Sequence, residues 1–329
     1  MALPDILRRP LTLPVVASPM FIASGPELVS AQCQAGVIGA FPALNARPAS
    51  LLNEWLHQIS ESNAKFSAAH PERPVAPFAV NQIVHRSNNR LDEDMATIIE
   101  HQVPIVITSL GAREEVNEAV HSYGGIVLHD IINDRFARKA IEKGADGVIA
   151  VAAGAGGHAG TQSPFALVQE IRSWFDGPLL LSGAMAHGRS ILAALAAGAD
   201  FAYVGSAFLA TREANVVDDY KQMIVESSAA DIVYSNLFTG VHGNYLRGSI
   251  TAAGLDPDDL ATSDPSAMSF GSSDDSSSPS KAWRDIWGSG QGIGSVDAIV
   301  SVDELVGRLA REYGEAREAL DTRLREFTS

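Results

Sequence analysis

The stretch PLLLSGAMAHGRSILAALAAGADFAYVGSAF, residues 178–208, contains the pattern that decides the fold. A short apolar run, PLLLSGA, ends in a glycine turn, and small and apolar residues at helical spacing follow it. Gly198 then ends the expected helix, as glycine does just beyond a helical C-terminus, and a second apolar run, FAYVGSAF, begins. Strands that are apolar on both faces and alternate with helices indicate a parallel sheet covered by helices.

The same rhythm extends from this unit over the first two thirds of the chain. Each of eight short apolar runs is followed by small or polar residues and then by a helical pattern; the runs are 15–20, 38–44, 78–84, 105–111, 125–131, 147–154, 178–184 and 201–208. Eight such units predict an α/β protein with a closed (β/α)8 barrel, the TIM barrel. A doubly wound open sheet is the alternative that the same pattern allows.

After residue 211 the rhythm breaks, which divides the chain into three parts. We expect the barrel in 1–211, a small helical cap with a Ser/Asp-rich loop in 212–285, and a segment that returns to the barrel in 286–329. The loop, SDPSAMSFGSSDDSSSPSK at 263–281, has the composition of a disordered or surface segment. The end of the chain has the pattern of one amphipathic helix or a pair of them.

The bulk composition excludes several classes of protein. A net charge of −15 over 329 residues argues against nucleic acid as a partner, because a phosphate-binding surface is basic. The single cysteine, Cys33, excludes a disulfide framework within the chain, and no histidine pair has metal-ligand spacing, so we expect no metal. No apolar run approaches the roughly 18 residues of a membrane span, and the first residues lack the apolar core of a signal peptide. We therefore expect a cytoplasmic protein that does not contact a membrane.

The seventh and eighth expected strands end in small residues, where barrels often bind phosphate. Chemistry in such barrels takes place at the carboxyl ends of the strands, and the last two units commonly hold a phosphate group. The backbone amides of Gly183, Ala184, Gly205 and Ser206 are candidates to bind it, since small residues let a ligand approach the main chain. The alternative is that these glycines only permit tight turns.

His158 lies in VAAGAGGHAG, directly after the sixth expected strand, among residues with almost no side chains. Glycines there leave space for a flat ligand, and an imidazole with an ordinary pKa near 6.5 suits proton transfer at neutral pH. We predict that His158 is catalytic; a loop histidine that merely binds a carbonyl is the alternative. His129 and His242 are weaker candidates to line the substrate pocket.

Five blocks of sequence, in a fixed order, carry a resemblance to a known family. They are ASPM (17–20), FAVNQIV (78–84), AAGAGGHAGTQSPFALVQEIR (152–172), the LSGA and YVGSAF strand ends of the opening stretch, and KAWRDIWGSGQGIGSV (281–296). Together they span about residues 14–300. In these blocks the chain resembles the nitronate monooxygenases, formerly called 2-nitropropane dioxygenases.

The resemblance implies an FMN-dependent barrel enzyme that oxidises alkyl nitronates, such as propionate-3-nitronate, with O₂ to a carbonyl compound and nitrite. It implies that His158 is the active-site histidine, with a small-molecule substrate as the partner. The residues that it implies for FMN are Ala17, Ser18, Pro19, Met20, Asn81, Ala155, Gly156, Gly157, Ser182, Gly183, Ala184, Gly205, Ser206, Gly290 and Gln291.

Two departures from the family pattern keep other activities open. Family members often carry Glu where this chain has Gly154, and many read GGI where it has Ser182, Gly183 and Ala184. The same scaffold hosts NAD(P)H-dependent FMN reductases of quinones or enoyl thioesters, which is the second hypothesis. A cofactor-free barrel isomerase or lyase and a non-catalytic flavin-binding protein are further alternatives, and a homodimer is left open.

Overall fold

Eight parallel strands form the central sheet of the computed structural model, which describes residues 3–263 and 285–328. Neighbouring strands follow the order β1-β9-β8-β6-β5-β4-β3-β2. Ile38 closes the ring between the two ends of this order, because the amide of Ala17 donates to its carbonyl (2.8 Å) and its own amide donates to Val15 (3.1 Å). The strands are β1 Val15–Ala17, β2 Gly39–Pro42, β3 Phe78–Ile83, β4 Ile105–Ser109, β5 Ile126–Ile131, β6 Gly147–Val151, β8 Leu179–Ser182 and β9 Phe201–Val204.

The (β/α)8 barrel predicted from the sequence is therefore confirmed, and each of the eight apolar runs contains one strand. Most runs extend past the carboxyl end of their strand: residues 18–20 and 183–184 belong to loops at that end of the barrel. Small and polar residues at the end of an apolar run thus mark the loops above the barrel.

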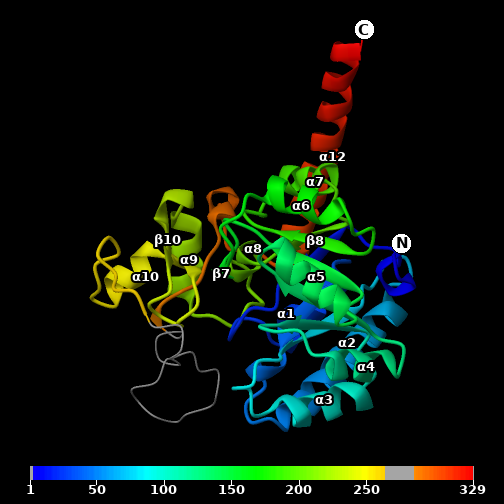
Figure 1. The fold of residues 1–329 in the computed structure, drawn as a ribbon. Helices are drawn as coiled ribbons and strands as arrows, with labels where there is room; N and C mark the ends of the chain where they lie inside the picture. Colours follow the sequence, from blue (N-terminus) through cyan, green and yellow to red (C-terminus); the bar gives the residue numbers. More distant parts are fainter. Residues whose placement is uncertain (1–2, 264–284, 329) are drawn as a thin grey trace.

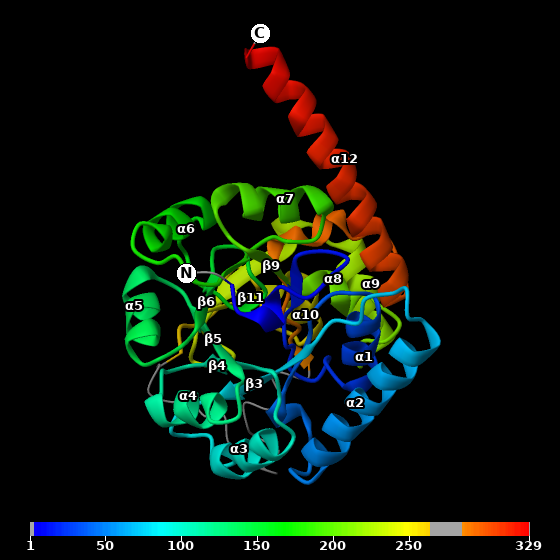
Figure 2. The ribbon, with the colours of Figure 1, turned by 90° about the vertical axis from the view of Figure 1, so that its right-hand side faces the viewer.

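Helices surround the strands, as the end-on view in Figure 2 shows. They are α1 Pro26–Gln34, α2 Leu51–Ala69, α3 Leu91–Glu100, α4 Glu114–His121, α5 Asp134–Glu142, α6 Pro164–Arg172, α7 Gly188–Ala197 and the short α8 Ser206–Leu209. Gly198 ends α7 with φ +112°, a conformation that glycine adopts without strain. Short 3₁₀ turns occur at Asp5–Leu7, Ala43–Asn45, Ala229–Asp231 and Gln291–Ser295.

Two apolar layers make up the core. One fills the barrel itself, with Val16, Ile107, Leu128 and Leu180 fully buried, and the other lies between the strands and the surrounding helices. Because the strands contribute to both layers, they read as continuous apolar runs rather than as alternating patterns.

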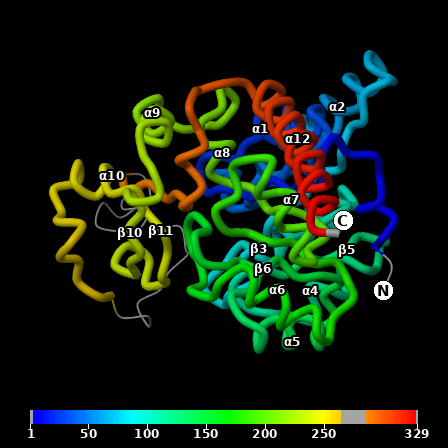
Figure 3. Tube along the Cα trace, turned by 90° about the horizontal axis from the view of Figure 1, so that it is seen from above, coloured from blue at the N-terminus to red at the C-terminus, as the bar shows by residue number. Residues whose placement is uncertain are grey.

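The cap contains helices α9 Asp218–Glu226 and α10 Arg247–Ala252, and it stands to one side of the barrel (Figures 1 and 3). It also contains strands β10 Ile232–Ser235 and β11 Gly243–Leu246, which the sequence analysis did not predict. With β7 Gly157–His158 from the barrel they form an antiparallel sheet in the order β10-β11-β7. The cap is therefore mixed, not only helical. The predicted loop at 263–281 lies outside the described residues apart from Ser263.

The chain ends in one long helix, α12 Val302–Thr328, and not in a pair. Leu305 and Leu309 are buried where α12 packs against α7 and α1, and its last turns extend away from the barrel (Figures 1 and 2). Within the described ranges, none of the helices has both the length and the apolar character that crossing a membrane requires.

Candidate active site

A cavity of about 1200 Å³ opens at the carboxyl ends of the barrel strands, between the barrel and the cap. Loops after nearly all barrel strands line it, together with cap residues such as Tyr234 and Trp287. The predicted site residues that line it are Ser18, Pro19, Met20, Asn81, His129, Ala155, Gly156, Gly157, His158, Ser182, Gly183, Ala184, Gly205, Ser206, His242 and Gly290. Residues from five separate blocks of sequence thus meet around one space.

Ala17 and Gln291 are the two predicted residues that do not line this cavity. Ala17 is fully buried within β1. The backbone amide of Gln291 donates to Gly154 O (2.9 Å), and a Cβ built on Gly154 would lie 3.0 Å from Gln291 Oε1. Gly154 also has φ +84°, so a larger residue there would be strained as well as crowded. Gln291 therefore packs over the glycine loop from outside.

The ends of β8 and β9 present main-chain groups to the cavity. Gly183 has φ +134°, and a Cβ at this position would lie 2.7 Å from Ala153 O, so only glycine fits. Among the described residues, the amides of Gly183 and Gly205 donate to no backbone acceptor, whereas the amide of Ala184 donates to Gly154 O (3.2 Å). Two amides at adjacent strand ends are thus available to bind an anion.

Several residues that line the cavity have a strained backbone conformation. Four described residues other than glycine have positive φ, and three of them line it: Ile22 (65°), Leu110 (61°) and Ala184 (54°). Such conformations cost roughly 1–3 kcal/mol each and concentrate at functional sites. Their positions, in loops after β1, β4 and β8, add to the indication that this end of the barrel is the working face.

His158 lies where the barrel loop joins the cap sheet, in β7. Its Nε2 is 3.1 Å from Thr239 Oγ1, and that hydroxyl also lies 2.9 Å from Val241 O. The imidazole donates to this hydroxyl when Nε2 carries the ring proton and accepts from it when Nδ1 does. Burial lowers the pKa of His158 to about 4, so the ring is neutral at pH 7.

A chain of hydrogen-bonded polar side chains on the floor of the cavity was not predicted from the sequence. Asn81 Nδ2 donates to Ile107 O (3.0 Å) and to Ser109 Oγ (2.7 Å), and Ser109 Oγ donates to Asp130 Oδ2 (2.6 Å). Burial raises the pKa of Asp130 to about 6. Tyr203 lies near this carboxyl, and burial followed by the Asp130 charge raises its pKa. Ser109 and Asp130 stand at or near the carboxyl ends of their strands, which is the one signal that could have pointed to them.

The two weaker histidine candidates lie at different depths. His129 is buried in β5, with Nδ1 2.6 Å from Thr108 Oγ1, and burial lowers its pKa to about 4. His242 is exposed on the cap and stacks on Tyr234 with ring centroids 5.1 Å apart. His129 thus belongs to the floor of the cavity and His242 to its rim.

The charge of the lining differs from that of the whole chain. Among the described residues, its cationic side chains apart from histidines are Arg47 and Lys139, and its carboxylate is Asp130. Neither cation forms an ion pair within that part of the chain. Arg47 Nε donates to Leu44 O (3.0 Å), and the guanidinium lies 5.3 Å from the centre of the Phe21 ring. A protein of net charge −15 therefore has a cavity rim that favours anions.

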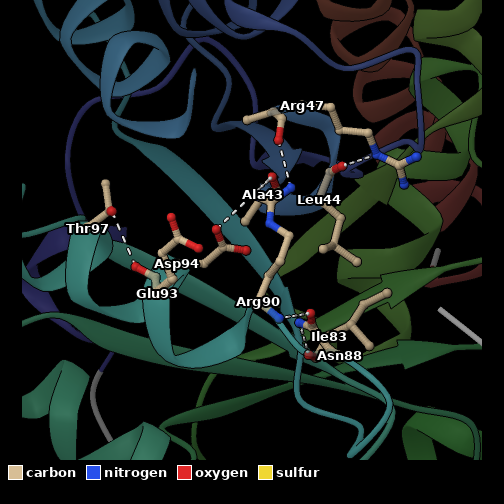
Figure 4. Close-up of polar contacts among 10 residues, drawn as sticks. Ala43, Leu44, Arg47, Ile83, Asn88, Arg90, Glu93, Asp94 and Thr97 are labelled. Carbon is tan, nitrogen blue, oxygen red and sulfur yellow. Dashed lines mark hydrogen bonds and ion pairs between the residues drawn. The ribbon is translucent and has the colours of Figure 1, made fainter. Parts of the chain in front are cut away.

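A buried ion pair supports the wall that carries Arg47 (Figure 4). Arg90 donates to Asp94 Oδ1 (2.7 Å) and to the carbonyls of Ala46 (2.7 Å) and Ala43 (3.3 Å). Burial lowers the pKa of Arg47, and the nearby charge of Arg90 lowers it further. No group of three potential metal ligands occurs in residues 3–263 and 285–328.

Comparison with known proteins gives consistent matches. The family model described as nitronate monooxygenase matches residues 6–312. A hydroxy-methyl-oxo-octahydroindene-carboxyl-CoA dehydrogenase of Rhodococcus jostii is 26% identical over 73% of this chain and 68% of its own length. A nitronate monooxygenase of Paraburkholderia phytofirmans is 26% identical over 74% of this chain and 76% of its own length. The solved structure of FabK from Thermotoga maritima superposes with a TM-score of 0.75 at 25% identity and covers 97% of each chain.

Proposed function

The chain belongs to the nitronate monooxygenase family of oxidoreductases, and from this premise we propose that it binds FMN and oxidises an alkyl nitronate with O₂ to a carbonyl compound and nitrite. The observation that carries the proposal is the cavity at the strand ends, with main-chain donors on one side and His158 on another. Its volume of about 1200 Å³ exceeds the roughly 300–1,000 Å³ of sites for single small ligands, so it has room for a cofactor and a substrate.

The residues of the cavity fit FMN. The free amides of Gly183 and Gly205 would hold the phosphate, while Ser18 to Met20 and Ala155 to Gly157 would border the ring. Side chains are excluded there, because a Cβ on Gly156 would lie 2.8 Å from Gly290 N. FMN, when bound, supplies the redox chemistry between the substrate and O₂. Ala17 and Gln291 would act indirectly, by shaping the strand end and the glycine loop.

His158 would orient the substrate and would not remove a proton from it. An imidazole with a pKa of about 4 is a weak base at neutral pH. A nitronate is already deprotonated at carbon, so its oxidation needs no such base, whereas a neutral nitroalkane would need one. His242 at the rim and His129 on the floor would border the same space.

A second candidate function is reduction of a quinone or enoyl thioester by NAD(P)H. The likeness to FabK over 97% of both chains supports it, as does a cavity large enough for a second sizeable ligand. Reduction of a quinone or enoyl thioester needs a proton donor, and an imidazole that is neutral at pH 7 is a poor one. Asp130, whose pKa burial raises to about 6, is a further titratable group in the cavity that would serve this function.

Anaerobic mixing separates the two functions. We expect the purified protein to absorb near 450 nm and to bleach rapidly with propionate-3-nitronate but not with NADH or NADPH. In air, the nitronate should drive O₂ uptake with release of nitrite. Rapid bleaching by a nicotinamide, and none by nitronates, would establish the reductase instead. A colourless protein that takes up no FMN would rule out both functions.

A further inference from the structure

Three consecutive barrel strands contribute one directed chain of hydrogen bonds beneath the cavity. It runs from Asn81 in β3 through Ser109 in β4 to Asp130 in β5, with lengths of 2.7 and 2.6 Å. All three side chains line the cavity, and Asn81 and Ser109 are less than 10% exposed. Asp130 is half-buried, and a carboxyl group withdrawn from water is costly, so its presence needs a reason beyond packing.

The direction of the chain follows from the donors and acceptors present. A carboxylate only accepts, so Asp130 takes the single hydroxyl proton of Ser109. Ser109 Oγ can then only accept from Asn81, which must turn its NH₂ group toward it. The carbonyl of Ile107 accepts the other proton of the same NH₂ group (3.0 Å). Both protons of the amide are thereby used, and Oδ1 is the atom of Asn81 left for a ligand.

We propose that Asp130 is a positioning residue that, through Ser109, fixes the carboxamide of Asn81 so that its Oδ1 accepts a hydrogen bond from the imide N3–H of the bound flavin. This inference rests on the proposed function, because it concerns the cofactor of the same site. Without the carboxylate, the carbonyl of Ile107 alone would favour the same orientation, while Ser109 could donate to Asn81 and so favour the flipped amide, which presents NH₂ to the cavity. An NH₂ group facing an imide N–H would repel it.

The test compares FMN with its N3-methyl analogue, which lacks the imide proton. Flavin is removed from the full-length protein, and the dissociation constant of each flavin is measured by titration. Asp130→Asn keeps the shape of the side chain but lets it donate as well as accept, and Ser109→Ala breaks the chain at its centre. Thr108→Val, on the same strand, is the control, since its hydroxyl contacts His129 and not Asn81.

We expect Asp130→Asn and Ser109→Ala to raise the dissociation constant of FMN by about fivefold, which corresponds to the loss of one hydrogen bond. The dissociation constant of the N3-methyl analogue should stay within about twofold of its value in the unaltered protein. Thr108→Val should keep the ratio of the two flavins' dissociation constants at its value in the unaltered protein. If either variant weakened both flavins equally, or neither, the carboxyl would have a merely structural role and the inference would be wrong. Failure of the unaltered protein to bind FMN at all would instead overturn the proposed function.

Discussion

His158 lies directly opposite Gly243 in the antiparallel pairing of β7 with β11, so a strand of the cap positions the histidine of the barrel loop. The pairing is close: a Cβ on Gly243 would lie 2.8 Å from Gly157 O and 3.1 Å from Tyr245 Oη. Glycine is therefore needed at this point for the cap to approach the barrel.

The first prediction follows from this contact. Gly243→Ala should force β11 away from β7 and displace the imidazole, and a displacement of about 1 Å can lower the rate by up to about 100-fold. We expect kcat with a nitronate to fall by about tenfold or more while the barrel stays folded, as measured by steady-state kinetics and circular dichroism. Gly314→Ala in α12 is the control, because nothing lies within 4 Å of the added methyl group. Equal activity of the two variants would contradict the role of the pairing.

The second prediction concerns stability at the cavity floor. Burial raises the pKa of Asp130 from 3.8 to about 6, so the folded protein binds this proton more tightly than the unfolded chain. Its stability contribution is present below pH 3.8 and is lost as the pH rises through 6, which costs about 2–3 kcal/mol at pH 7. Asp130→Asn should therefore raise Tm at pH 7 and have little effect at pH 4.

His129 should give the opposite dependence of Tm on pH in the same experiment. Burial lowers its pKa from 6.5 to about 4, so the stability that it contributes is present above pH 6.5 and is lost as the pH falls through 4. His129→Gln should accordingly reduce the loss of Tm between pH 6.5 and 4. A Tm gain from Asp130→Asn that was as large at pH 4 as at pH 7 would show that folding does not raise the pKa of this carboxyl above its value in the unfolded chain.

The third prediction concerns the charge of the rim. Arg47→Ala should raise KM for propionate-3-nitronate, which carries a carboxylate, by about fivefold, as expected for loss of a partly exposed charge contact of about 1 kcal/mol. The KM for propyl-2-nitronate, whose tail is uncharged, should change less. The difference should shrink at high ionic strength, which screens exposed charges. An equal change in KM for both substrates would argue against a carboxylate contact.

Most of the barrel and much of the site could be predicted from the sequence, for a physical reason. The barrel strands are buried on both faces, so each appears as a short apolar run, as at 105–111 and 147–154. Residues at the ends of these runs meet at one edge in a parallel barrel, which is why Gly183, Gly205 and His158, predicted from separate runs, all line one cavity.

Two features were missed because they depend on tertiary contacts. β7 is only Gly157 and His158, and neither residue favours strands, so its pairing with Gly243 has no local signal. The chain from Asn81 to Asp130 crosses three strands, and uniformly apolar runs do not show which side chains face the cavity. Asp130 and Ser109 stand at or near strand ends, which is the one signal that could have pointed to them, but neither residue was among the predicted site residues.

The last prediction tests the wall behind Arg47. Arg90→Ala should destabilise the protein by about 3–5 kcal/mol, because Asp94 is 1% exposed and would be left as an unpaired buried charge. The carbonyls of Ala43 and Ala46 would also lose their donor, so the segment that carries Arg47 should loosen.

Lys65→Ala is a matched control for Arg90→Ala. Lys65 and Glu61 form a pair at the same helical spacing, 2.8 Å apart, but both side chains are about 70% exposed. Loss of such a surface pair has little effect on stability, because water and salt screen both charges. Chemical unfolding followed by circular dichroism would measure both values. Similar losses for the two variants would mean that the Arg90 network adds nothing beyond an ordinary surface pair, and Arg47 would then have to be held by Leu44 and Phe21 alone.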